Sequence, residues 1–340
     1  MSRPTIADVA AASGVSISTV DRVLTGRKAV KRATAERVLA AAQEIGFYAA
    51  GVIRHNLEAR PTYTLGFLLQ QGSRSFYRAL AQQLTEACAT YPYATIQARI
   101  EFMEDLSPHA VAEQMLKLGK KVQALSVVAA EHARVTQAIE SLAADGVPTF
   151  SVISTLTAPC GVGYIGLDNW KVGRTAAWAF HRFCPQGGKV AIIVGSHRYR
   201  CQELNETGFR SYCREHASGF QLLEPLISGE HKSVAAELTR NLLLREPELK
   251  GLYIAGGGVT GVLEVLREQQ SHHLITVAHD LMDVTRSGLL DGHLSLVLSH
   301  PLTKLAEVNV HSMVTSIRES RTKPLPMHLL AFDMYTSENL

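Results

Sequence analysis

The sequence predicts an α/β protein in two parts: an N-terminal helix-turn-helix head of three short helices, and a two-lobed body built on parallel sheets. Residues 5–46 carry apolar side chains at helical spacing, interrupted by turn residues. After residue 61, short β-rich runs alternate with longer amphipathic segments, which is the pattern of βα units. With 340 residues, the chain is long enough for two or three domains.

The head begins with two helices joined by a tight turn. Thr5 precedes the first helix and has Asp8 three residues later, the arrangement of a capping box. Gly14 supplies the unusual backbone angle that the turn needs, and Ser16 can cap a second helix over residues 17–24. The third helix has an apolar face formed by Val38, Ala42 and Ile45, and Gly46 ends it.

The second helix is predicted to enter the major groove of DNA. With Val20 buried, Arg22 can make a bidentate contact to guanine, Ile17 can touch a thymine methyl, and Ser18 can donate or accept. The basic residues that follow are placed for phosphates, which position a protein without specifying sequence. The candidate DNA contacts are Thr5, Ser16, Ile17, Ser18, Thr19, Asp21, Arg22, Arg27, Lys28, Lys31, Thr34, Arg54 and Leu57. The alternative is a small three-helix interaction module that binds no nucleic acid.

Charge is distributed unevenly along the chain. Residues 1–60 hold nine Arg or Lys and five Asp or Glu, whereas the net charge of the whole chain is only +3. A basic head on a near-neutral body favours a polyanion bound at one end.

The head also resembles a known family. The string from Val15 to Arg27, followed by Val30, Thr34, Arg37-Val38, Ala41-Ala42 and Ile45-Gly46-Phe47, is similar to the N-terminal domain of the lactose/galactose repressor family. This resemblance implies a head, a hinge helix, and a body similar to periplasmic sugar-binding proteins. It further implies a homodimer on near-palindromic double-stranded operator DNA, with a small ligand that releases repression or promotes it. Asp21 stands where the family usually has serine, and Thr25 where asparagine is common.

Residues 49–61 correspond to the family's hinge segment. By spacing to Gly66, Leu57 falls where the family has a leucine that wedges into the minor groove. The segment is short and polar, so we expect it to become helical only when two chains meet on DNA. A plain interdomain linker is the alternative reading.

The body is predicted to form two lobes with a cleft between them. We assign residues 62–162 and 292–320 to the first lobe, and residues 163–291 and 321–340 to the second. Ligands of α/β sheets bind beyond the carboxyl ends of the strands. The candidate ligand-binding residues, most of which follow predicted strands, are Gln70, Phe76, Tyr77, Asp168, Asn169, His197, Tyr199, Asn205, Gly257, Asp280 and His300. Carboxylates, amides and imidazoles around aromatic rings suit a sugar or polyol.

Two departures from the family concern this cleft. Asn205 stands where the family often has a ligand-anchoring arginine, three residues before its Gly-Phe signature. Gly256-Gly257-Gly258 replaces a usual Asn-Asp pair. The effectors of well-known family members therefore do not predict the effector of this chain.

A nicotinamide nucleotide is the rival ligand. Gly256-x-Gly258-x-x-Gly261 follows a predicted strand, and Asp280 ends the next strand, as in a dinucleotide-binding fingerprint. A dehydrogenase or a redox-sensing regulator would use it. The motif lies late in the chain, however, whereas a dinucleotide fold normally uses its first strand for this turn.

Other classes are disfavoured. The five cysteines include no Cys-x-x-Cys, which predicts neither a disulfide framework nor a zinc site and favours a reducing cytoplasm. The start of the chain lacks the apolar core of a signal peptide, and no run is suited to a membrane. No enzyme signature occurs, so we expect neither catalysis nor a cofactor. No leucine-rich heptad tail follows the body, which favours a dimer over a tetramer.

Overall fold

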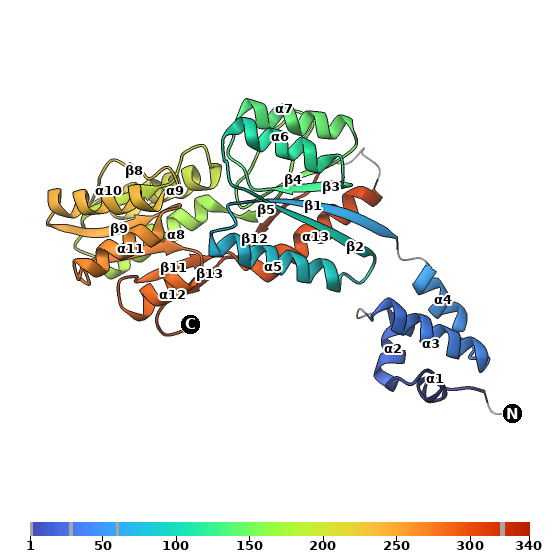
Figure 1. Ribbon diagram of the computed structural model, residues 1–340. Helices are drawn as coiled ribbons and strands as arrows, with labels where there is room; N and C mark the ends of the chain where they lie inside the picture. Colours follow the sequence, from blue (N-terminus) through green and yellow to red (C-terminus); the bar gives the residue numbers. More distant parts are fainter. Residues whose placement is uncertain (1–2, 27–29, 59–60, 320–323) are drawn as a thin grey trace.

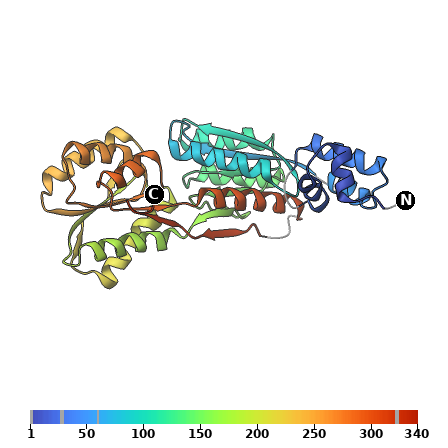
Figure 2. The same ribbon diagram turned by 90° about the horizontal axis from the view of Figure 1, so that it is seen from below.

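The computed structural model describes residues 3–26, 30–58, 61–319 and 324–340. Two perpendicular views show three bodies in a row, with a helical head at one end and two α/β lobes beyond it (Figures 1 and 2). The predicted fold class is confirmed. No helix within these ranges is both long and apolar enough to cross a bilayer.

The head contains three helices followed by a fourth: α1 (Ile6–Ser13), α2 (Ile17–Thr25), α3 (Arg32–Glu44) and α4 (Ala50–Glu58). The predicted capping box is present, with Thr5 and Asp8 bonding reciprocally at the start of α1. Gly14 adopts the left-handed conformation at φ 67°, and Ser16 caps α2 by accepting from the Thr19 N–H. The core of the head is small and apolar, and includes Val9, Val20, Val38 and Ala42.

Helix α4 corrects the prediction for the hinge. The single chain already forms this helix, whereas we expected it to need a second chain and DNA. Its stabilisation comes from the head: Ile53 is fully buried in the head core, and Asn56 Nδ2 donates to the Leu24 carbonyl at 3.0 Å. The length and polarity of the segment alone do not reveal these two tertiary contacts.

The first lobe contains a six-stranded parallel sheet in the order β12-β5-β4-β3-β1-β2. Its strands are β1 (Thr62–Gln70), β2 (Thr95–Met103), β3 (Ala124–Val127), β4 (Thr149–Val152), β5 (Gly163–Leu167) and β12 (Met327–Leu330). Helices α5 (Ser75–Thr90) and α13 (Leu302–Arg318) cover one face, and α6 (Pro108–Gly119) and α7 (Ala133–Ala144) cover the other. Alternate residues of β1 enter the two apolar cores, since Phe67 packs on the first face and Leu68 on the second.

The second lobe repeats the architecture with the order β13-β11-β10-β9-β6-β7, and β8 also pairs with β6. Its strands are β6 (Gly188–Val194), β7 (Phe220–Leu222), β8 (Leu226–Ile227), β9 (Leu249–Ile254), β10 (Ile275–His279), β11 (Leu296–Ser299) and β13 (Asp333–Tyr335). Helices α8 (Asn169–Phe183) and α9 (Arg200–His216) pack on one face. The other face carries α10 (Lys232–Arg245), α11 (Val259–Glu268) and α12 (Asp283–Leu290). Only β13 runs antiparallel to its neighbour among the described pairs.

The predicted lobe boundaries are wrong by one strand at each crossing. β5 pairs with β4 in the first sheet, so the chain first crosses after residue 167 and not before 163. β11 pairs with β10 in the second sheet, so the return crossing follows residue 299. The last crossing lies between β12 and β13, because β12 rejoins the first lobe. A buried parallel strand has the same apolar pattern in either sheet, so sequence alone does not reveal its partner.

Candidate nucleic-acid interface and ligand cleft

The outer face of α2 is polar, with one exposed apolar group. Val20 and Val23 face the core, which turns Ser18, Asp21 and Arg22 to the surface. Ile17 is 58% exposed at the start of the helix. An exposed isoleucine and an exposed arginine on one helix are side chains that can contact a thymine methyl and a guanine edge. The helix is positioned by Ser16, whose hydroxyl contacts the Thr19 hydroxyl at 2.8 Å.

Asp21 does not orient an arginine in the described part of the head. Neither Asp21 nor Arg22 makes an ion pair there, and both side chains are exposed. The Arg22 guanidinium is therefore available to a ligand. Asp21 leaves a local negative charge on the same surface, which phosphates would avoid.

The other predicted DNA contacts are spread over the head. Lys31 and Arg54 are exposed, Thr34 is half-buried in the first turn of α3, and the Thr5 hydroxyl is engaged in its capping box. Arg27 and Lys28 lie outside the described residues. Leu57 is half-buried near the end of α4 and lines a crevice of about 310 Å³ together with Arg22, Lys31 and Asn56.

A cleft of about 560 Å³ lies between the two lobes. It is lined by nine of the predicted residues: Gln70, Phe76, Tyr77, Asn169, Tyr199, Asn205, Gly257, Asp280 and His300. They come from strand ends and helix starts in both lobes, where the carboxyl ends of the two sheets meet.

Two of the predicted residues, Asp168 and His197, do not line this cleft. The Asp168 carboxylate caps α8 by accepting from the Lys171 N–H at 3.2 Å, and it pairs with the Lys171 ammonium. His197 Nε2 contacts Glu206 Oε2 at 2.6 Å on an exposed loop. Both residues follow strands, but local partners hold them away from the cleft.

Aromatic rings form the apolar part of the wall. Phe76 and Tyr77 are each 8% exposed at the start of α5, with their rings packed edge to face at 5.1 Å. Tyr199 faces them from the second lobe and hydrogen bonds with the Gln70 side chain. Burial raises the pKa of both tyrosines well above the usual range, so each presents a neutral hydroxyl. Such amphipathic rings suit the apolar face and the hydroxyls of a sugar.

Asp280 and His300 form the most buried side-chain pair of the wall. His300 Nδ1 lies 2.7 Å from Asp280 Oδ1, which also accepts from the His300 N–H at 3.0 Å. Burial alone would raise the pKa of Asp280, but the charge and hydrogen bonds of His300 outweigh it and lower the pKa. With Nδ1 held by the carboxylate, Nε2 is the ring nitrogen left for a ligand.

Two buried polar atoms of the wall have no partner within the described residues: His300 Nε2 and Asn205 Oδ1. Both residues line the cleft. A buried polar atom without a hydrogen bond costs free energy, typically about 1–3 kcal/mol. Ligand hydroxyls, which can donate and accept, would satisfy both atoms.

His279, next to this pair, is neutral. Burial lowers its pKa to about 4, and its Nε2 lies 2.8 Å from the Tyr253 hydroxyl.

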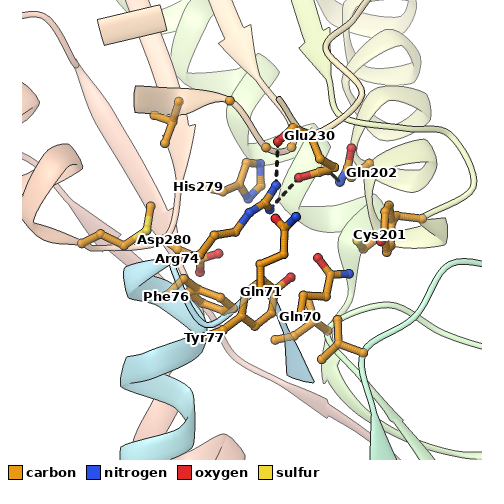
Figure 3. A pocket seen from close by; sticks show the side chains of 18 of the residues that line it. Gln70, Gln71, Arg74, Phe76, Tyr77, Cys201, Gln202, Glu230, His279 and Asp280 are labelled. Atoms are coloured by element: carbon orange, nitrogen blue, oxygen red, sulfur yellow. Dashed lines mark hydrogen bonds and ion pairs between the residues drawn. The ribbon is translucent and has the colours of Figure 1, made fainter. Parts of the chain in front are cut away.

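Arg74, Glu230 and Gln202 form a network that joins the lobes (Figure 3). Arg74, just before α5, donates to Glu230 Oε2 at 2.7 Å and to the Glu230 carbonyl at 2.7 Å. Gln202 Nε2 donates to the other carboxylate oxygen at 2.6 Å, while its Oε1 accepts from the Gly195 N–H at 2.7 Å. Burial lowers the pKa of Arg74, but the Glu230 carboxylate more than compensates and raises it.

The glycines of the dinucleotide-like motif make room for this network. A Cβ on Gly257 would lie 1.8 Å from Glu230 Oε2, and one on Gly261 would lie 2.1 Å from the Lys232 carbonyl oxygen. The loop before α10 therefore packs directly on these glycines. A pyrophosphate at this turn would meet the Glu230 carboxylate, so packing accounts for the glycines without a nucleotide.

Two family models match the chain. One, described as bacterial regulatory proteins of the lacI family, matches residues 5–49. The other, described as a periplasmic binding protein domain, matches residues 65–314. The chain belongs to the LacI family of bacterial regulatory proteins.

Curated relatives of this LacI-family protein match over a limited length. The catabolite control protein A of Priestia megaterium is 31% identical over 121 residues, or 36% of this chain and 35% of that protein. The maltose regulon regulatory protein MalI of Escherichia coli is 41% identical over 87 residues, 24% of each. The ribose operon repressor of Escherichia coli is 31% identical over 97 residues, 28% of this chain and 29% of that protein. The matched stretches thus span about a third or less of these relatives, which are regulators by name.

Solved structures resemble the body of this LacI-family protein. A glucose-galactose binding protein from Geobacillus stearothermophilus has a TM-score of 0.74 at 17% identity, covering 83% of this chain and 99% of that one. A solute binding protein from Burkholderia graminis, in complex with D-arabinose, has a TM-score of 0.74 at 18% identity, covering 83% and 97%. At these identities the likeness concerns the fold alone, and none of these matches favours a nucleotide.

Sequence reasoning overlooked Arg74, Glu230 and Gln202. Arg74 follows β1 by four residues and Glu230 follows β8 by three, so the rule that found Gln70 and Asp280 applied to both. β8 is only two residues long and follows β7 after three residues, so the sequence does not mark a separate strand end there. Gln202 lies in the first turn of α9, where no pattern separates a cleft residue from a surface one.

Proposed function

We propose that this LacI-family protein is a cytoplasmic, sequence-specific transcription repressor whose affinity for operator DNA is controlled by a sugar or polyol. One observation carries the proposal. A head with an exposed polar surface on α2 is joined through α4 to a body whose interlobe cleft holds two buried polar atoms without a partner among the described residues. A ligand in the cleft would satisfy these two atoms, and a duplex would contact the exposed side chains of α2.

The head binds DNA through the outer face of α2. Arg22 contacts a guanine edge, Ile17 packs on a thymine methyl, and Lys31 pairs with a phosphate. A nine-residue helix reads only a few base pairs. Two heads related by a two-fold axis would read a near-palindromic site, and this is why we propose a homodimer.

The cleft binds the effector. Hydroxyls of a sugar would hydrogen bond with His300 Nε2 and donate to Asn205 Oδ1, and its apolar face would pack against Phe76 and Tyr77. Because the ligand contacts both lobes, it changes their relative position. The hinge helix α4 moves together with the first lobe. Differential affinity for the two states couples the sites, typically by about 1–3 kcal/mol, or 5- to 150-fold in affinity.

The test combines DNA selection with ligand release. Duplexes that bind the full chain are selected from a random pool, and their affinity is measured by fluorescence anisotropy with and without a panel of neutral sugars and polyols. We expect a near-palindromic consensus, and at least one panel member should weaken binding at least about fivefold. A pool that yields no consensus would contradict the DNA-reading role. A consensus that no ligand affects would contradict the sensing role.

A further inference from the structure

The Arg74–Glu230 ion pair lies inside the cleft and bridges it. Arg74 belongs to the first lobe and Glu230 to the second, with side chains 24% and 10% exposed. Three restraints hold the Glu230 carboxylate in place: the Gln202 amide and the backbones of Gly195 and Gly257, which approach it too closely for a side chain. Glu230 also sits at φ 67°, a left-handed conformation that its loop imposes.

The charged groups inside the cleft already have partners without any ligand. Arg74 is paired with Glu230, and Asp280 is paired with His300. His279 is neutral because burial lowers its pKa to about 4. An added carboxylate or phosphate would lack a free countercharge in the interior and would face the carboxylates of Glu230 and Asp280. An uncompensated charge in such a site is costly.

The cations at the mouth of the cleft do not change this balance. Arg78, His231 and Lys232 are exposed there. Arg78 donates to the carbonyl oxygens of Gly72 and Ser73, and Lys232 pairs with Glu264. Exposed charges of this kind are screened by water and salt.

Arg74 nevertheless keeps hydrogen-bonding capacity for a ligand. A guanidinium carries five N–H donors, and its bonds to Glu230 use two of them. The remaining donors suit hydroxyl oxygens, which need no countercharge.

We infer that Glu230 makes the cleft selective for uncharged polyhydroxylated ligands, because it neutralises Arg74 and thereby excludes sugar acids and sugar phosphates. The inference rests on the proposed function, since it concerns the effector of the same cleft. Glu230 acts here as a specificity-determining residue that need not itself touch the ligand.

The first experiment compares matched sugars on the full-length protein by isothermal titration calorimetry. The pairs are D-galactose with D-galacturonate, D-glucose with glucose 6-phosphate, and D-ribose with ribose 5-phosphate. The neutral member that binds the wild type should bind at least about tenfold more tightly than its anionic partner, and Glu230→Gln should narrow or reverse that ratio. An anionic member that binds the wild type more tightly than its neutral parent would overturn the inference.

The second experiment needs no knowledge of the effector. Inorganic phosphate is titrated into wild type, Glu230→Gln, and the control Glu246→Gln, with potassium chloride at equal ionic strength as reference. Glu246 is a half-buried carboxylate that pairs with Lys189 outside the cleft, so the control makes the same change in net charge. Glu230→Gln should bind phosphate at least about tenfold more tightly than the other two proteins, and adding Arg74→Gln should abolish the gain. Equal phosphate binding by all three proteins would refute the role of Glu230.

The two experiments separate this inference from the proposed function. If no sugar binds the wild type and none releases DNA, the sensing role fails, while the phosphate titration still decides whether Glu230 neutralises Arg74. If Glu230→Gln does not fold, as judged by circular dichroism, the wild-type comparison of neutral and anionic sugars decides the selectivity.

Discussion

Asp280 Oδ1 accepts two hydrogen bonds from His300, one from the ring at 2.7 Å and one from the backbone at 3.0 Å. The two residues directly follow neighbouring strands of the second lobe, β10 and β11. After His300 the chain leaves that lobe for the first. Asp280 adopts φ 63°, a conformation that asparagine and aspartate tolerate better than most residues. One carboxylate therefore fixes both a ring of the cleft wall and the exit of an interlobe connection.

The burial of His279, next to Asp280, predicts that the folded protein loses stability in acid. Its pKa falls from 6.5 to about 4 on burial. Between these values the unfolded chain binds the proton and the folded chain does not, so stability falls as the pH falls from 6.5 to 4. The loss has an upper limit of about 3 kcal/mol, from the size of the shift. We expect urea unfolding to show this loss in the wild type and a smaller loss in His279→Gln. The control is His109→Gln, an exposed histidine; equal pH dependence in all three proteins would contradict the prediction.

Arg22 predicts a loss of specific DNA binding. Replacing it with alanine removes the bidentate donor of α2 without touching the core, so the selected operator should lose about 1–3 kcal/mol of discrimination, roughly 5- to 150-fold in affinity. Affinity for a scrambled duplex should change much less, because phosphate contacts remain. Anisotropy on both duplexes measures this. Arg37→Ala, which removes an exposed cation from α3, serves as the control. Unchanged operator affinity in Arg22→Ala would reject the assignment of α2.

Local patterns were sufficient to predict the head but not the lobes. Thr5, Gly14 and Ser16 set helix ends through bonds within a few residues, so their roles follow from spacing alone. Whether β5 and β11 belong to the first or the second lobe depends on the strands they pair with, and their apolar patterns do not reveal these partners.

The cleft was predictable in part for a similar reason. Topology brings strand ends together, which located Gln70, Asp280 and His300. Whether a residue at a strand end faces the cleft depends on local partners, and these hold His197 on Glu206 and Asp168 on the start of α8. The Arg74–Glu230 pair joins residues 156 positions apart; each of them follows a strand, but no pattern in the sequence predicts that they pair.

Helix α4 predicts unequal effects of two neighbouring apolar residues. Ile53 is fully buried in the head core, whereas Val52 is 50% exposed on the same helix. Ile53→Ala should destabilise the head by about 2–5 kcal/mol, as expected for a buried isoleucine, and Val52→Ala by much less. Amide hydrogen exchange along residues 50–58 reports on this directly. Equal exchange in the two variants would mean that α4 is not docked on the head in solution.

The close packing of Gly257 on Glu230 predicts that a larger residue at position 257 disturbs the Arg74–Glu230 ion pair between the lobes. A methyl group there would lie 1.8 Å from Glu230 Oε2, so Gly257→Ala should displace the carboxylate from Arg74. Overpacking of this kind costs about 1–3 kcal/mol. We expect a lower melting temperature and a larger radius of gyration by small-angle scattering, as the lobes separate. The control is Gly219→Ala, whose nearest contact is an ordinary 3.4 Å. If Gly257→Ala melts and scatters like Gly219→Ala, the close packing is absent in solution.

Leu57 predicts that operator binding bends the DNA. Inserting an apolar side chain between base steps partly unstacks them, and kinks of about 20–90° result in minor-groove binders that do so. Leu57→Ala should therefore reduce the bend, measured by energy transfer between dyes on the two ends of the operator. Because Leu57 is also half-buried against the head, Leu57→Met is needed as a variant that keeps an apolar wedge and its packing. His55→Ala changes an exposed residue of the same helix and should leave the bend intact. A bend unaltered in Leu57→Ala, with the head still folded, would show that α4 positions the head without acting as a wedge.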